Sequence, residues 1–189
     1  MPYVQDALSV TIEVLVGLYL IAVILRFLFQ LFRVDFRNPI SQTIVKITNP
    51  PLRLLRKFIP GLFGIDMASV VLILIVGCLK LFLLTSIAGL RISPAAILVL
   101  SVAEILNIVC WTLLIAIFAR AIISWVAPRS YHPAIRILDG LSEPLLSPFR
   151  RLLPNTGGLD LSPIFAILAI NLVQRLLINP LFDFSRQLL

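Results

Sequence analysis

Two stretches of this chain decide its fold. Residues 26–66 read RFLFQLFRVDFRNPISQTIVKITNPPLRLLRKFIPGLFGID, and residues 120–160 read RAIISWVAPRSYHPAIRILDGLSEPLLSPFRRLLPNTGGLD. Aligned at a constant offset, segments 26–74 and 120–168 share 10 identical residues in 49 positions without a gap. Most of these identities are Pro, Arg, Gly or Asp, which a common apolar composition does not generate. The chain is therefore predicted to be a tandem duplication.

The residues that recur are those that break helices, carry charge or cap helix ends. They form pairs at equivalent positions: Arg26 and Arg120, Pro39 and Pro133, Pro50 and Pro144, Pro60 and Pro154, Gly64 and Gly158, and Asp66 and Asp160. Because proline ends helices and glycine permits tight turns, we expect most of these pairs to shape the backbone of each copy. Each aspartate precedes an apolar segment, where a carboxylate caps a helix; a functional acid is the alternative.

The composition is that of a membrane protein. Hydrophobic residues make up 60% and charged residues 13% of the 189, and the mean hydropathy is +1.06, outside the range of soluble domains. Four apolar segments, at about 7–32, 67–90, 96–126 and 161–182, are long enough to cross about 30 Å of hydrocarbon as helices. The period-2 alternation of a membrane barrel is absent. The basic n-region of a signal peptide is also absent, because the first basic residue is Arg26. We expect an all-α membrane protein of two parallel repeats, residues 1–90 and 96–182.

The uneven distribution of basic residues predicts the orientation. Of 16 Lys and Arg residues, six lie between the first two apolar segments: Arg33, Arg37, Lys46, Arg53, Arg56 and Lys57. Four lie between the last two: Arg129, Arg136, Arg150 and Arg151. By the positive-inside rule, both repeated connections are cytoplasmic and both termini lie on the other side. The net charge of +7 is interpreted as an orientation signal rather than as a sign of nucleic-acid binding.

Each cytoplasmic connection is predicted to contain a short amphipathic helical segment. Asn38 and His132 each precede a proline, as in an N-cap followed by proline in the first turn. Apolar residues then recur at helical spacing as far as Pro50 and Pro144, where we expect the helix to stop and a second piece to begin. The residues expected to contact anionic lipid headgroups are Arg53, Arg56, Lys57, Arg150 and Arg151. The alternative is that these segments are linkers packed on the bundle.

The duplicated pattern resembles the YggT family, also called YlmG. Its elements here are an arginine near the end of a span, Asn-Pro or His-Pro, Pro-Pro-Leu or Pro-Leu-Leu, two basic residues, and then Pro, Gly and Asp. The span ending at Ser124-Trp125 also resembles the family, whereas the first copy has Gln30-Leu31 there. The resemblance implies a small multi-pass protein of the bacterial inner membrane, built from two repeats. It also implies a connection with osmotic or ion homeostasis, cell division or membrane-protein assembly, without an agreed molecular activity.

The sequence does not predict an enzyme. It has one histidine, His132, and two cysteines, Cys78 and Cys110, which lie inside apolar segments. This set is too small for a metal site, and no phosphate-binding loop or nucleophile elbow is present. We therefore predict no catalytic residue, no metal and no cofactor, and we interpret His132 as a helix cap.

Several polar residues lie within the predicted spans, where ionisable groups are costly and often functional. The repeat offset places Glu13 level with Asn107, and Lys80 one residue from the position of Arg175. We therefore predict a polar network of Glu13, Lys80, Glu104, Asn107 and Arg175. Such a network is either a buried packing feature or a path for ions or protons. Arg26 and Arg120 lie near the cytoplasmic ends, where a long side chain reaches the interface.

Two classes of function remain open. The favoured one is a non-catalytic membrane organiser or assembly factor, whose partners are anionic lipids and other membrane proteins or further copies of itself. The second is a small ion channel or transporter that uses the charges within the spans. Neither interpretation involves nucleic acid.

Overall fold

The computed structural model describes residues 2–62, 64–126, 132–153 and 160–188. Its elements are α1 (Pro2–Leu31), α2 (Pro39–Leu55), α3 (Met67–Ile87), α4 (Pro94–Val126), α5 (Pro133–Leu152), α6 (Ser162–Val173), the π-helical segment η1 (Gln174–Ile178) and α7 (Asn179–Gln187). Within these described ranges there is no strand, and the prediction of an all-helical fold is confirmed.

Four helical segments are long and apolar enough to cross a membrane: Tyr3–Leu31, Met67–Ile87, Pro94–Ser124 and Ser162–Gln187. Two predicted boundaries were short, because α1 begins at Pro2 rather than near residue 7, and the last span ends at Gln187 rather than near 182. This last span contains a π-helical turn just before Pro180, in which the Asn179 N–H donates to the Gln174 carbonyl. Pro180 has no N–H to donate. It follows the π-helical turn and lies in the first turn of α7, so the span continues past the proline.

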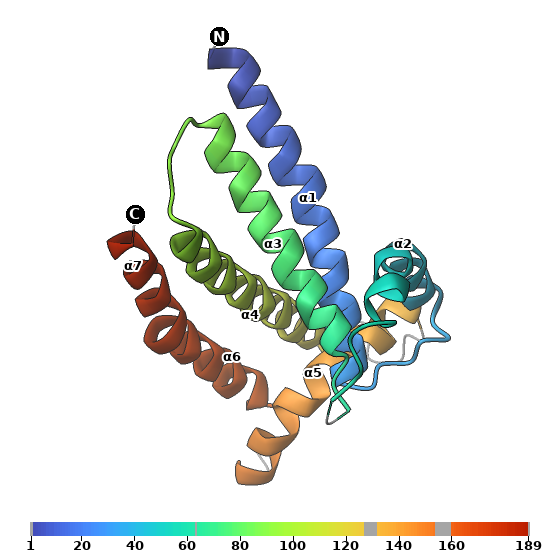
Figure 1. Ribbon diagram of the computed structural model, residues 1–189. Coiled ribbons are helices and arrows are strands. Elements are labelled where there is room, and N and C mark those ends of the chain that lie inside the picture. The colour runs from blue at the N-terminus through green and yellow to red at the C-terminus, as the bar shows by residue number, and fades with distance from the viewer. Residues whose placement is uncertain (1, 63, 127–131, 154–159, 189) are drawn as a thin grey trace.

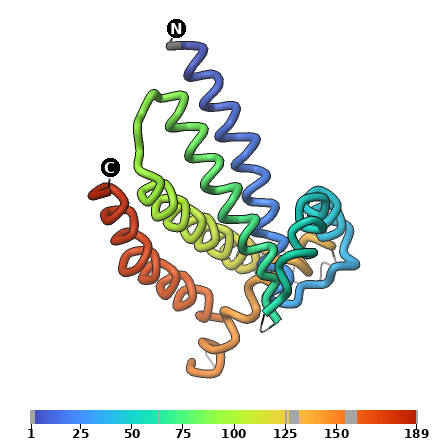
Figure 2. Tube along the Cα trace, viewed as in Figure 1, coloured from blue at the N-terminus to red at the C-terminus, as the bar shows by residue number. Residues whose placement is uncertain are grey.

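The spans pack in the order of the sequence, and both termini lie at one end of the molecule (Figures 1 and 2). α1 lies along α3, α3 along α4, and α4 along α6 and α7. The two short helices, α2 and α5, lie at the opposite end from the termini. Each copy thus follows the same course of span, short helix and returning span, as expected for parallel repeats.

Apolar side chains on one face of each span form the interior of the bundle. Leu20, Ile24 and Leu28 recur at helical spacing on α1 and are almost fully buried. They belong to a continuous cluster with Leu72 of α3 and Ile117 of α4. Much of the remaining apolar surface of the spans is exposed, which is the arrangement expected where lipid replaces water as the solvent.

Glycines mark two close approaches between helices. A β-carbon added at Gly77 of α3 would lie 2.9 Å from the Ile105 side chain of α4, so the absence of a side chain permits this contact. A β-carbon at Gly140 of α5 would lie 2.8 Å from the side chain of Val34, which follows α1. The second contact brings α5 of the second copy against the first copy.

The expectation that prolines would divide each short helix was wrong. α2 runs through Pro50 and Pro51, and α5 runs through Pro144 and Pro148. A proline inside a helix removes one backbone donor, so Pro50 and Pro51 leave the carbonyls of Lys46 and Ile47 without their helical N–H partners. The turn before them has extra side-chain bonds: the Thr48 hydroxyl donates to the Ile44 carbonyl at 2.7 Å, and Arg26 of α1 donates to the Val45 carbonyl.

The N-terminal cap predicted for each short helix is confirmed. The Ile40 N–H donates to the Asn38 side-chain oxygen at 3.0 Å, and the Ala134 N–H donates to His132 Nδ1 at 3.2 Å. Asn38 has a further contact that the sequence did not reveal, because its Nδ2 donates to the carbonyl of Pro133 at 2.7 Å. The N-cap residue of the first copy is therefore hydrogen-bonded to the first residue of α5 in the second copy.

The predicted orientation is testable because α2 and α5 lie at one end and the termini at the other. In a variant in which Cys78 and Cys110 are replaced by Ala, single cysteines are introduced at Gln42, Ser147 or Gln187. We expect an impermeant thiol reagent to label Gln187→Cys in intact cells, but to label Gln42→Cys and Ser147→Cys only after lysis, because basic connections remain cytoplasmic. The opposite pattern would show that the orientation is inverted.

Candidate functional site at the basic end of the bundle

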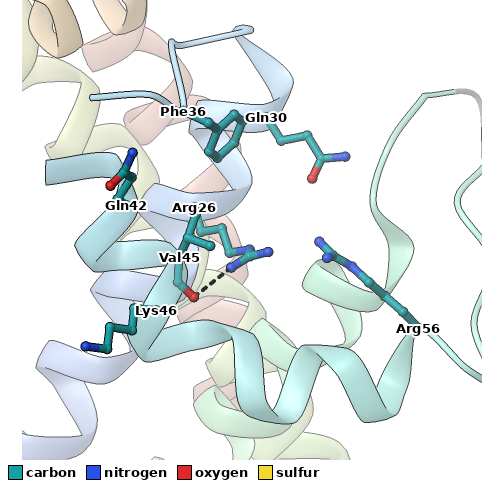
Figure 3. Close-up of a pocket in the computed structure, with 7 residues that line it drawn as sticks. All are labelled: Arg26, Gln30, Phe36, Gln42, Val45, Lys46 and Arg56. Atoms are coloured by element: carbon teal, nitrogen blue, oxygen red, sulfur yellow. Dashed lines mark hydrogen bonds between the residues drawn. The ribbon is translucent and has the colours of Figure 1, made fainter. Parts of the chain in front are cut away.

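Arg26 fixes the end of α1 to α2. Its side chain is 6% exposed. Nη1 donates to the Val45 carbonyl at 3.1 Å, a bond drawn in Figure 3, and to the Thr48 hydroxyl at 3.0 Å. Nη2 donates to the Asn49 side-chain oxygen at 3.5 Å. All three acceptors are neutral, so these contacts orient the guanidinium without neutralising it.

Arg120 holds the equivalent position in the second copy, but its partner is acidic. Arg120 Nε donates to Asp139 Oδ1 of α5. Asp139 is aligned with Val45, so both arginines reach the same place on the following short helix. Both copies therefore have a bond from the arginine to the short helix, but the acceptor is a neutral carbonyl in the first copy and a carboxylate in the second. The sequence analysis did not identify Asp139 as a site residue. The repeat offset, which aligns Arg120 with Arg26 and Asp139 with Val45, could have indicated it.

An ion pair connects the end of each short helix to the start of the next span. Arg56 Nη2 lies 2.5 Å from Asp66 Oδ2, and Arg150 Nε lies 2.8 Å from Asp160 Oδ2. Arg150 Nη1 also donates to both carboxylate oxygens of Glu143 at 2.7 Å. The repeat motif placed these residues at equivalent positions, and the structure brings each arginine to its aspartate.

The two aspartates differ in how they contact the following helix. Asp66, which is 8% exposed, is the N-cap residue of α3, but its carboxylate accepts from the Ser69 hydroxyl at 2.6 Å rather than capping the backbone. Asp160 accepts from the backbone N–H of Ser162 at 2.9 Å. Burial alone would raise the pKa of each carboxyl. Hydrogen bonds from Arg56 and Ser69 outweigh it at Asp66, and hydrogen bonds from Ser162 and Arg150 outweigh it at Asp160, so both pKa values fall below the ordinary range.

A pocket of about 450 Å³ lies between α1 and α2 in the first copy (Figure 3). Its lining residues are Arg26, Gln30, Phe36, Gln42, Val45, Lys46 and Arg56. The guanidinium groups of Arg26 and Arg56 point toward each other from two different elements, while the Lys46 ammonium points away from them. None of the lining residues is acidic. The pocket therefore has the charge and the donors to hold an anion.

The second copy has a pocket of about 340 Å³ at a corresponding place. Its polar lining residues include Arg120, Ser124, Arg150 and Asp160, of which the first three are aligned with Arg26, Gln30 and Arg56. The remaining lining is mostly apolar and comes largely from α4 and α6. The duplication thus reproduces the position of the pocket.

Three of the basic residues predicted to contact lipid are exposed and form no ion pair within the described residues. These are Arg53, Lys57 and Arg151. Arg56 and Arg150, predicted to contact lipid as well, are held by the carboxylates described above. Pro60 precedes the turn that contains Gly64, whose φ of +79° favours glycine. Pro154 and Gly158 lie outside the described residues.

Within the spans, the structure brings together two polar pairs. Lys80 of α3, 5% exposed, forms an ion pair with Glu104 of α4. Gln174 of η1 donates to the side-chain oxygen of Asn107 of α4 at 3.1 Å. Gln174 was not anticipated, although the repeat offset aligns it with Lys80. The pairs place polar contacts at the α3–α4 and α4–η1 interfaces.

The other two residues of the proposed network lie apart from these pairs. Glu13 is exposed on α1, and Arg175 is exposed on η1. Arg175 borders a pocket lined otherwise mainly by apolar residues of α6. In the part of the chain that the structure describes, no group of three His, Cys, Asp or Glu side chains is suited to a metal ion, and Cys78 and Cys110 are free thiols.

The sequence was compared with protein families and with known proteins. The model of the CCB3/YggT family matches residues 5–87 and again residues 99–181. The chain belongs to the CCB3/YggT family. It is 44% identical over 172 residues to an uncharacterised protein of Pseudomonas aeruginosa, an alignment that covers 90% of this chain and 87% of the relative. It is 34% identical over 171 residues to the uncharacterised protein YggT of Escherichia coli strain K12, and that alignment covers 90% of this chain and 88% of the relative. No solved structure matches.

The two matches to the CCB3/YggT model coincide with the two copies of the repeat. Residues 5–87 contain nearly all of α1 to α3, and residues 99–181 contain most of α4 to α7. The family resemblance inferred from the arginine, proline and aspartate pattern is confirmed. The names of these two relatives assign no activity.

The ion pair of the first YggT repeat, in which the aspartate is buried, is expected to stabilise the fold more than the exposed pair of the second. Asp66→Asn leaves Arg56 without its charged acceptor beside a buried side chain, so we expect a loss of about 1 to 3 kcal/mol in the free energy of unfolding in detergent. Asp160→Asn should cost less than about 1 kcal/mol, because Arg150 and Asp160 are 42% and 45% exposed. Asp183→Asn, in an exposed pair at the other end, is the control.

The Arg56–Asp66 pair also predicts how acid changes the stability of the protein. The folded-state pKa of Asp66 lies below the ordinary value of 3.8, so its contribution to stability is complete above that value and is lost as pH falls through the lower folded-state pKa. As pH falls through this window, the Tm of the unmodified protein should decrease more than the Tm of Asp66→Asn. Equal acid sensitivity of the two proteins would contradict this assignment.

Proposed function

We propose that this protein is a non-catalytic organiser of the bacterial inner membrane that gathers anionic lipids, and through them or directly other membrane proteins, at its cytoplasmic basic end. The observation that carries the proposal is the position of α2 and α5 at the same end of the bundle, with exposed basic side chains at Arg53, Lys57 and Arg151. Osmotic or ion homeostasis and cell division are the processes in which such an organiser would act.

Burial along the short helices supports this proposal. Leu52 of α2 and Leu146 of α5 face the interior, whereas Arg53 and Arg151 are exposed. A helix that has one face on the bundle and basic residues on its exposed side lies naturally along a headgroup layer. Each basic residue near an anionic leaflet contributes about 1 kcal/mol of attraction, so the exposed set favours anionic over zwitterionic neighbours.

The acidic residues at this end support a non-catalytic role. Asp66, Asp139, Glu143 and Asp160 each pair with an arginine. Carboxylates held by guanidinium groups are not free to exchange a proton with a substrate. Their arrangement suits the attachment of short helices to spans.

A small channel or transporter is the second candidate. It is favoured by the Lys80–Glu104 pair, because ionisable groups inside spans commonly line ion or proton paths. Against it, the two charges form an ion pair with each other across the α3–α4 interface, as packing groups do.

The lipid proposal is tested with the full-length protein in vesicles of phosphatidylglycerol and phosphatidylcholine, in which spin-labelled lipids report the lipid shell around the protein. We expect selectivity for phosphatidylglycerol, which weakens as salt rises from about 0.1 M to about 1 M and the screening length falls from about 10 Å to about 3 Å. The triple variant Arg53→Gln, Lys57→Gln, Arg151→Gln should lower the relative affinity at least about fivefold.

The control for this experiment is the double variant Arg91→Gln, Arg186→Gln, which removes charge at the end that carries the termini. It should retain the selectivity of the unmodified protein. Equal binding of both lipids by the unmodified protein would refute the organiser proposal.

Flux measurements separate the two candidates. Purified protein in liposomes should pass no saturable cation or proton current. Glu104→Gln should instead lower the free energy of unfolding by about 2 to 3 kcal/mol, because Lys80 loses its charged partner in a buried position. Saturable flux that Glu104→Gln abolishes in correctly folded, inserted protein would establish the transporter instead.

A further inference from the structure

The two copies place equivalent arginines beside a pocket but surround these arginines with opposite charge. In the first copy, the six aligned positions of the site are Arg26, Val45, Lys46, Asn49, Arg56 and Asp66. In the second copy they are Arg120, Asp139, Gly140, Glu143, Arg150 and Asp160. Three basic and one acidic residue give the first set a net charge of +2, and two basic and three acidic residues give the second set −1.

The second copy neutralises its own arginines. Arg120 pairs with Asp139, and Arg150 pairs with both Glu143 and Asp160. Each guanidinium therefore has at least one carboxylate of the same chain against it. An added anion would meet carboxylates already in the positions that it needs.

The first copy does not neutralise its arginines to the same extent. Arg26 is bonded only to neutral acceptors among the described residues, and Arg56 has Asp66 as its one acidic partner. At the places where the second copy has Asp139 and Glu143, the first has Val45 and Asn49. Two guanidinium groups converge on the pocket without an acidic lining residue (Figure 3).

We propose that the pocket between Arg26 and Arg56 is a binding site for one phosphate group, and that Asp139 and Glu143 take the place of that anion in the second copy. Guanidinium groups bind phosphate oxygens through paired N–H donors. The bonds from Arg26 to α2 hold its guanidinium in place before the anion arrives, which lowers the cost of binding. The pocket is at the end of a candidate span, where the headgroup layer is expected to begin.

This inference rests on the proposed function and deepens it, since it replaces a diffuse attraction by one discrete site. The phosphate belongs either to a lipid headgroup or to a free phosphate in the cytoplasm. Both sources share the chemistry that the pocket recognises, and the experiment distinguishes them.

The test is calorimetric titration of the full-length protein in a nonionic detergent. The probes are inorganic phosphate, short-chain phosphatidic acid and short-chain phosphatidylcholine. We expect one saturable site for phosphatidic acid and none for phosphatidylcholine. Inorganic phosphate that binds at this site and displaces the lipid would identify free phosphate as a sufficient ligand, and binding of the lipid alone would identify a headgroup. Absence of saturable binding of either anion would overturn the proposal.

The decisive variant transfers the acids of the second copy into the first. Val45→Asp combined with Asn49→Glu should weaken phosphatidic acid binding at least about tenfold, because the new carboxylates occupy Arg26 and Arg56. The second copy already folds with these residues at the same positions. Arg136→Gln, an exposed change on α5, should leave binding unchanged. Full affinity in the folded double variant would refute the site.

Two further variants keep the result interpretable. If the double variant does not fold, Arg56→Gln, which removes one of the two guanidinium groups at the pocket, should still weaken binding severalfold, and unchanged affinity there would count against the site. The triple variant at Arg53, Lys57 and Arg151 should lose lipid selectivity in vesicles but keep the calorimetric site. In the unmodified protein, lipid selectivity without the calorimetric site would refute the pocket alone, and the calorimetric site without lipid selectivity would refute the organiser proposal alone.

Discussion

The attachment of an arginine near the end of a span to the short helix that follows is the interaction on which the rest of the architecture depends. Arg26 holds α2 and Arg120 holds α5, at equivalent positions of the two copies. A second arginine on each connection, Arg56 or Arg150, then binds the aspartate that precedes the returning span. Each short helix is thus anchored at two places, and these contacts set where the chain re-enters the bundle.

The sequence predicted the features that depend on local chemistry. Four apolar segments, proline-led helices capped by Asn38 and His132, and the duplication itself are all written in spacing and composition. The prediction failed at Pro50 and Pro144, where each helix continues through its prolines; in α2 the turn before Pro50 is held by Arg26, which comes from another helix. Sequence order gives no direct information about which side chain will supply such a donor.

The candidate site was predictable in its members more than in its pairings. The basic residues and aspartates stood out because they recur, but Asp139, Glu143 and Gln174 act at positions where the copies differ. Identity between copies draws attention to shared contacts and hides the divergent ones. Glu13 and Arg175 were grouped with Lys80 and Glu104 by depth alone, and depth does not specify which face of a helix a residue occupies.

The bond from Asn38 to the Pro133 carbonyl has an evolutionary consequence. Two identical copies around a twofold axis would make this contact twice, once in each direction. Here the partner cap is His132, and within the described residues its side chain serves its own helix without a return bond to the first copy. Because both copies lie in one chain, neither has to form a symmetric contact with an identical partner. The two halves can therefore carry different residues at this contact and are not interchangeable.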